Sequence, residues 1–172
     1  SELRENHMTL SEQTRLSLSA EAFTHTARYD AAISRYMNGL ADGGGRFGTN
    51  LTLSLPRVQT LRYGENPHQE AGLYGTFETI FAQLHGKELS YNNILDIDAA
   101  SRAVLEFEQP TVVIVKHTNP CGVATSETLG PAWDKAFATD TKSPFGGIIA
   151  VNRPLDVETA TAINEIFTEV VI

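Results

Sequence analysis

The chain has 172 residues, of which 41% are hydrophobic and 20% charged, and its formal net charge is -8. This balance is typical of a soluble protein with one core or two modest ones. The acidic surplus argues against nucleic acid or an anionic membrane as the main partner, because both need a basic face. No apolar run approaches the roughly 20 residues of a membrane-spanning helix. A single cysteine, Cys121, and an N-terminus without a secretion-like segment predict a cytoplasmic protein.

The first 45 residues are predicted to form a long helix that ends in a linker. Thr9 and Glu12 have the spacing of a capping box, which opens a helix. Apolar residues then recur at steps of three and four and predict a buried stripe, made of Leu16, Ala20, Phe23, Ala27, Ile33, Tyr36, Met37 and Leu40. The glycines at 43–45 predict the linker, because ordering glycine has the largest entropy cost.

The middle of the chain is predicted to contain one strand, one ordered loop and one helix. Residues 51–55 alternate leucine with polar residues, which is the period of a half-buried strand, and Pro56 ends it. Residues 62–75 contain Gly64, Pro67 and Gly72, which break regular structure, and are predicted to be mainly an ordered loop. From Asn92 the apolar spacing is again helical, and Pro110 marks the end of that helix.

The last third of the chain is predicted to alternate strands and helices. The apolar runs 111–115 and 147–151 are typical of strands covered on both faces, as in parallel sheets. A helix is predicted at 131–138 and another after a cap at Asp156, and residues 170–172 open a third strand. The order predicts an α/β domain with a mainly parallel sheet flanked by helices. Because the chain stops in a core strand, we expect it to be a piece of a longer protein.

Lys116 and His117 directly follow the first of these buried strands. Ligand crevices of open parallel sheets lie beyond the carboxyl ends of the strands. This strand could therefore hold two side chains that exchange protons in fixed positions at such a crevice. On position alone, a solvent-facing pair is an equally good interpretation. The residues that follow, 118–122, are rich in turn formers and predict a shaped turn.

Two other loops carry candidate binding residues. Arg62 and Tyr63 lie in the polar loop, where a planar guanidinium suits a phosphate, although a surface salt bridge is the better interpretation without other information. Phe145 offers a flat aromatic face, and Gly146 lets a ligand or another backbone come close. Taken alone, that second loop is better interpreted as a β-bulge beside a core phenylalanine.

A metal site is not predicted. His117 and Cys121 are close in sequence, but zinc usually needs three or four protein ligands. The Pro-Cys pair also occurs in zinc deaminases, whose signature includes a second cysteine and a His-x-Glu, and neither is present. Cys121 is therefore predicted to be a small packing residue.

Four segments, in this order along the chain, resemble the bacterial bifunctional purine biosynthesis family: LRYGENPHQ, SYNNILDIDAA, KHTNPCG and SPFGGIIAVNRPL. Members join an inosine monophosphate (IMP) cyclohydrolase domain to an aminoimidazole carboxamide ribonucleotide (AICAR) formyltransferase domain, and the resemblance covers nearly the whole chain. It implies that residues 1–45 are the C-terminal helical part of the cyclohydrolase domain with its linker. Residues 46–172 would be the N-terminal part of a truncated formyltransferase domain, with an incomplete cytidine-deaminase-like fold.

The resemblance also implies a reaction and its residues. A formyl group would pass from 10-formyltetrahydrofolate to the 5-amino group of AICAR, giving FAICAR in de novo purine biosynthesis. Carried over by position, the catalytic pair is Lys116 and His117, the substrate-binding residues are Arg62, Tyr63, Phe145 and Gly146, and the cofactor-binding residue is Asn93. Asn92 is the alternative alignment for Asn93.

The same resemblance implies a homodimer with shared active sites, AICAR and folate as small-molecule ligands, and neither a metal, a nucleic acid nor a membrane as partner. The truncated chain alone is expected to be inactive. Two alternatives stay open: a non-catalytic nucleotide-binding or dimerisation module of the same fold, and a metal-dependent deaminase. The ligand count supports the deaminase least.

Overall fold

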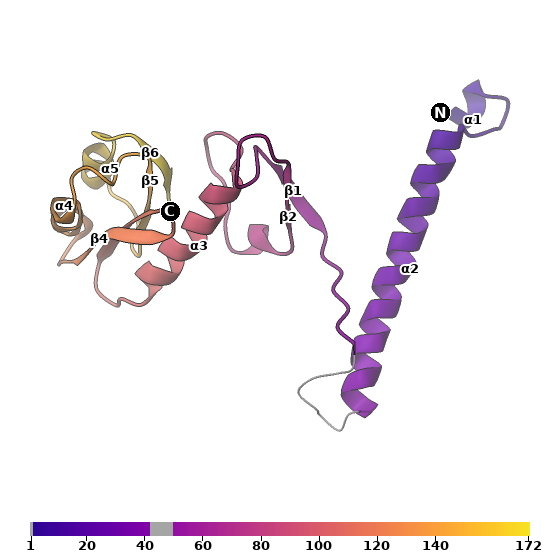
Figure 1. Ribbon diagram of the computed structural model, residues 1–172, viewed down its shortest axis with the longest axis horizontal. Helices are drawn as coiled ribbons and strands as arrows, with labels where there is room; N and C mark the ends of the chain where they lie inside the picture. The colour runs from indigo at the N-terminus through magenta and orange to yellow at the C-terminus, as the bar shows by residue number, and fades with distance from the viewer. Residues whose placement is uncertain (1, 42–49) are drawn as a thin grey trace. The chain divides into compact units, whose positions relative to one another are not determined.

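The computed structural model describes residues 2–41 and 50–172 (Figure 1). The chain divides into two compact units, Ser1–Pro56 and Arg57–Ile172. The glycine linker predicted at 42–45 lies outside the described residues. Within the described ranges, no helix is both long enough and apolar enough to cross a membrane.

The first unit is mainly one long helix. A short helix α1 (Glu2–Glu5) precedes α2 (Glu12–Ala41), and the prediction of a long helix is confirmed. The capping residue differs from the predicted one, because the hydroxyl of Ser11 accepts a hydrogen bond from the backbone N–H of Thr14 at 3.2 Å. The hydroxyl of Thr9 instead donates a hydrogen bond to the backbone carbonyl of Asn6.

The apolar stripe of α2 is exposed within its unit, so its predicted burial is wrong here. Phe23 is 73% exposed and Leu40 63%, and Ala31 is the buried residue of this helix. The other helix described in the unit, α1, has four residues and no buried side chain. An amphipathic pattern predicts which face can be buried, but burial also needs a covering element.

The predicted strand at 51–55 is also wrong. These residues form neither helix nor strand, and Leu51 is 85% exposed. The first strand is instead β1 (Arg57–Leu61), which pairs antiparallel with β2 (Ala71–Tyr74). The segment predicted as an ordered loop therefore contains a strand at its end, followed by the short helix η1 (Phe77–Thr79).

A four-stranded sheet in the order β4-β3-β5-β6 forms the centre of the second unit. Its strands are β3 (Thr111–Lys116), β4 (Asn119–Thr125), β5 (Gly147–Val151) and β6 (Thr168–Val171). β3 pairs antiparallel with both β4 and β5, and the β5–β6 pair is parallel.

The sheet is therefore mixed, and the prediction of a mainly parallel sheet is wrong. The residues predicted as a turn, 118–122, are largely strand β4, which returns antiparallel to β3. This extra reversal makes β5 run against β3. The α/β class, the buried strands and the strand near 170 are confirmed.

Helices cover both faces of this sheet. On one face lies α3 (Tyr91–Leu105), whose buried residues pack with Val113 and Val115. On the other face lie α4 (Leu129–Thr139) and α5 (Val157–Ile163), which pack with Val112 and Ile114. Alternate residues of β3 thus enter separate cores, as the two-residue period of a strand requires. The predicted helices are confirmed here, including the Asp156 cap, which accepts from the backbone N–H of Thr159 at 2.8 Å.

Candidate functional site

His117 and Thr118 are the two central residues of the tight turn between β3 and β4. Lys116 pairs with Asn119 across the hairpin, and the backbone φ angles of His117 and Thr118 are 53° and 61°. Two consecutive positive values in a two-residue hairpin describe a type I′ turn, which usually contains asparagine and glycine. The predicted catalytic histidine therefore lies at the tip of a hairpin. Both residues of the turn have positive φ angles, which are uncommon for residues other than glycine.

Three hydrogen bonds hold this turn. The backbone N–H of Thr118 donates to a carboxylate oxygen of Asp96 in α3 at 2.6 Å. The hydroxyl of Thr118 and the side-chain amide of Asn119 both donate to the carbonyl of His117, at 2.7 and 2.8 Å. The His117 side chain itself is exposed, so it is accessible to a ligand.

Lys116 joins the end of β3 to the loop before β5. Its Nζ donates a hydrogen bond to the carbonyl oxygen of Phe145. Gly146 follows with a φ of 71°, and a Cβ placed on it would lie 3.9 Å from Lys116 Nζ. The structure therefore brings together Lys116, Phe145 and Gly146, three of the predicted site residues.

Phe167, which the sequence prediction missed, connects this loop to a neighbouring cavity. Its ring lies 5.5 Å from that of Phe145, centroid to centroid, and its carbonyl accepts a hydrogen bond from the N–H of Gly146 at 2.7 Å. Phe167 also lines a cavity of about 180 Å³, together with Arg62, Lys87, Glu88, Leu89, Asn93, Thr168, Glu169 and Val170. The cavity thus places Arg62 and Asn93 near the loop that Lys116 contacts.

Arg62 and Tyr63 form a compact pair at the start of the polar loop. The guanidinium carbon of Arg62 lies 4.9 Å from the centre of the Tyr63 ring, and its Nη2 donates to the Tyr63 hydroxyl at 3.3 Å. Backbone hydrogen bonds from Arg62 to Leu89 and from Tyr91 to Tyr63 fix this loop against the start of α3. Among the residues that the structure describes, Arg62 forms no salt bridge, which was the alternative interpretation of this residue, and Arg62 is exposed.

Asn93 is held by a capping box at the start of α3. Its side-chain oxygen accepts hydrogen bonds from both the N–H and the hydroxyl of Ser90 at 2.9 Å, and the Ser90 hydroxyl accepts from the N–H of Asn93. Asn93 is 8% exposed and lines the cavity. Its neighbour Asn92 instead donates to the carbonyl of Glu65 at 3.2 Å and does not line this cavity. The geometry favours Asn93 over Asn92.

The loop that carries Phe145 is shaped by Asp140. Its carboxylate accepts hydrogen bonds from the N–H and hydroxyl of Ser143 and from the N–H of Lys142, and these bonds lower the pKa of Asp140 to about 2.

Cys121 packs against the hydrophobic core that contains the buried residues of α4, as predicted, and burial raises the pKa of its thiol. Among the described residues, no group of three or more metal-ligating side chains comes together.

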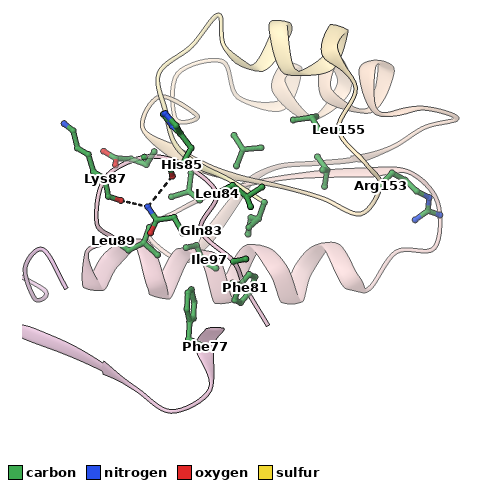
Figure 2. A pocket seen from close by; sticks show the side chains of 17 residues that line it. Phe77, Phe81, Gln83, Leu84, His85, Lys87, Leu89, Ile97, Arg153 and Leu155 are labelled. Carbon is green, nitrogen blue, oxygen red and sulfur yellow. Dashed lines mark hydrogen bonds between the residues drawn. The ribbon is translucent and has the colours of Figure 1, made fainter. Parts of the chain in front are cut away.

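A larger cavity of about 640 Å³ lies between the segment 77–89 and the end of β6. Figure 2 shows the side chains that line it. The side chain of Gln83 shapes this segment by donating to the carbonyls of His85 and Lys87. The lining is largely apolar and contains none of the predicted site residues. The smaller cavity is lined by two of the predicted site residues, Arg62 and Asn93, so we place the candidate site there.

The cavity residues that sequence reasoning missed include Lys87, Phe167 and Glu169. None of them directly follows a buried strand or lies in a glycine-rich turn, so no local pattern marks them as site residues. Glu169 lies in β6 one residue before the predicted start of that strand at 170, and its place in this cavity depends on the fold.

The whole chain, residues 1–172, matches the family model described as AICARFT/IMPCHase bienzyme. It is similar to the bifunctional purine biosynthesis protein PurH of Chlorobaculum parvum, with 56% identity over 99% of this chain and 34% of the relative. The proteins of the same name from Chlorobium chlorochromatii and Chloroflexus aurantiacus are 52% and 54% identical, over 99% of this chain and 34% and 32% of the relatives. The chain therefore spans about a third of the length of these curated relatives.

Proposed function

Since the chain belongs to the AICARFT/IMPCHase bienzyme family, we propose that it supplies part of an AICAR formyltransferase site in de novo purine biosynthesis. Residues 1–45 would be the helical end of the cyclohydrolase domain with its linker, and residues 46–172 the start of a transferase domain with a cytidine-deaminase-like fold. The matched family model is described as a bienzyme, and no comparison favours a non-catalytic module. The complete activity belongs to a protein of the relatives' length, which we propose to be a cytoplasmic homodimer.

The proposed reaction transfers a formyl group between two nitrogens. The 5-amino nitrogen of AICAR attacks the formyl carbon of 10-formyltetrahydrofolate and forms a tetrahedral intermediate. The amine loses a proton to a base, the bond from the formyl carbon to N10 breaks, and N10 takes up a proton. The products are FAICAR and tetrahydrofolate, and no oxidant or reductant is needed.

The contact of Lys116 with the Phe145 carbonyl is the observation that carries this proposal. It places a cationic donor at the loop predicted to face the substrate, where an ammonium group can stabilise negative charge on the formyl oxygen. The exposed imidazole of His117 is the better proton acceptor, because histidine can be neutral near pH 7. We therefore assign His117 as the base and Lys116 as the electrostatic stabiliser.

Arg62, Tyr63 and Asn93 are proposed to hold the small molecules at the adjoining cavity. The planar guanidinium of Arg62 suits a phosphate or another planar anion. The amide of Asn93 is oriented by Ser90, so its NH₂ group remains available to a folate acceptor. The cavity of about 180 Å³ is smaller than the about 300–1,000 Å³ of a drug-sized ligand site. We infer that other parts of the protein or a second subunit complete it.

Formyl transfer by the full-length protein tests the proposal. The variants Lys116→Ala and His117→Ala should each lower kcat by about 10²- to 10⁴-fold, while IMP cyclohydrolase turnover and the melting temperature stay unchanged. Lys142→Ala and His68→Ala are matched controls, since both side chains are exposed and lie outside the proposed site. Transfer at the parent rate in either catalytic variant would exclude that residue from the chemistry.

A further inference from the structure

Helix α3 contacts both parts of the candidate site from one face. Asn93, which lines the cavity, and Asp96, which contacts the hairpin turn, are three residues apart in this helix. Side chains at that spacing are neighbours on the helix surface. The helix therefore contacts both the cavity, through Asn93, and the turn that carries His117, through Asp96, and fixes their positions relative to each other.

The turn needs support from outside because its own sequence does not favour its conformation. Both His117 and Thr118 have positive φ angles, and Thr118 is branched at Cβ, which makes the left-handed region especially unfavourable. Two of its hydrogen bonds, from Thr118 and Asn119 to the carbonyl of His117, are made within the hairpin. Among the hydrogen bonds that the described residues make to this turn, the one from another element is accepted by Asp96.

We propose that Asp96 is a positioning residue for formyl transfer. By accepting the N–H of Thr118 at 2.6 Å, its carboxylate holds the turn in the left-handed conformation and so fixes the direction in which His117 leaves the strand. The backbone of His117 is thereby held at a fixed position relative to Lys116 in β3 and to Asn93 in α3. Asp96 acts through the turn and does not contact the substrates. The inference rests on the function proposed above.

Steady-state kinetics of formyl transfer in the full-length protein test this role. Asp96→Ala should lower kcat about tenfold to a hundredfold, as expected for a misplaced catalytic group, with KM values within about twofold of the parent. Asp96→Asn should retain most of kcat, because its side-chain oxygen can still accept the hydrogen bond. Asp98→Ala is the matched control, since Asp98 lies two residues further in the same helix and pairs with Arg102 at 2.9 Å. It should behave like the parent.

A second pair of measurements reports on the turn itself. Hydrogen exchange at the Thr118 amide, resolved by fragmentation mass spectrometry, should accelerate in Asp96→Ala and stay slow in Asp96→Asn. Adding Thr118→Gly to Asp96→Ala should recover part of the lost kcat, because glycine adopts positive φ without strain. Thr118→Gly alone should stay active.

Three results would overturn the inference. One is an unchanged kcat in Asp96→Ala, and another is unchanged Thr118 exchange in that variant. The third is an Asp96→Asn variant that is as slow as Asp96→Ala but keeps the Thr118 amide protected, since the charge of Asp96 would then matter and not its hydrogen bond. If the parent protein itself lacks formyl transfer, the proposed function fails, and the exchange measurement still decides whether Asp96 holds the turn.

Discussion

Gly122 in β4 lies directly against the carbonyl oxygen of Ala136 in α4. A Cβ placed on Gly122 would lie 2.3 Å from that oxygen and 3.0 Å from its carbon. Backbone atoms of a packed helix cannot move aside as a flexible side chain can, so Gly122→Ala should shift β4 away from α4. We expect a loss of about 1–3 kcal/mol in the free energy of unfolding, measured by urea denaturation.

Gly130→Ala is the control for that substitution. Gly130 lies in α4 itself, and the nearest atom to its added Cβ is the Thr159 hydroxyl at 3.7 Å, which is an ordinary contact. Alanine favours a helix by about 1 kcal/mol relative to glycine, so this variant should be neutral or more stable. Equal destabilisation of both variants would show that the close approach at Gly122 is not the cause.

Gly146→Ala should impair formyl transfer through the backbone and not through crowding. The added Cβ meets Phe167 at 3.8 Å and Lys116 Nζ at 3.9 Å, both ordinary distances, but the φ of 71° is costly for alanine by about 1–2 kcal/mol. Relief of that strain would move the Phe145 carbonyl away from Lys116. The expected result is a lower kcat with a modest loss of stability, compared with Gly39→Ala, where the added Cβ has no neighbour within 4 Å. A kcat equal to that of the parent would contradict the proposed role of this loop.

Ser90→Ala should destabilise α3 and loosen Asn93 together. The Ser90 hydroxyl both accepts from the N–H of Asn93 and donates to its side chain, so its removal leaves the helix start uncapped. Loss of such a cap costs about 1 kcal/mol. We expect a lower melting temperature and a higher KM for the folate co-substrate. Ser90→Thr keeps the hydroxyl and should keep the parent's KM, with some loss of stability because Ser90 is buried and the added methyl must be packed. An unchanged KM in Ser90→Ala would argue against Asn93 as a ligand contact.

Acid should destabilise the second unit partly through Asp140. Hydrogen bonds from Ser143 and Lys142 lower the folded-state pKa of Asp140 from 3.8 to about 2. Its stabilising contribution is therefore complete above about pH 4 and is lost as the pH falls toward 2. The variant Asp140→Asn should show a flatter loss of stability over this window in chemical denaturation. Asp134→Asn, at an exposed carboxylate of α4, should keep the parent's pH dependence.

Much of the second unit could be predicted because its signals are local. The apolar runs at 111–115 and 147–151 identified buried strands, and the helical spacing after Asn92 identified α3. The capping residue Asp156 was also found, since its hydrogen bond spans three residues. These features depend on neighbours in the sequence, so propensity and periodicity were enough to identify them.

The direction of the strands could not be predicted in the same way. Residues 119–125 contain proline and glycine, which indicated a turn, but pairing with β3 along its length makes them a strand. Tertiary pairing overrides local propensity in such a case. The apolar stripe of α2 illustrates the converse, because a correct helix prediction did not establish that the stripe is covered.

The sequence by itself determined which residues form the buried strands and helices, and which side chains are candidates for chemistry. Only the tertiary structure decided that Lys116 contacts Phe145, 29 positions away, and that Asp96 contacts the turn of His117. Those contacts depend on the order of strands in the sheet and on which face α3 covers. Local preferences of single segments cannot specify such relations, because each arises from the packing of segments that are distant in sequence.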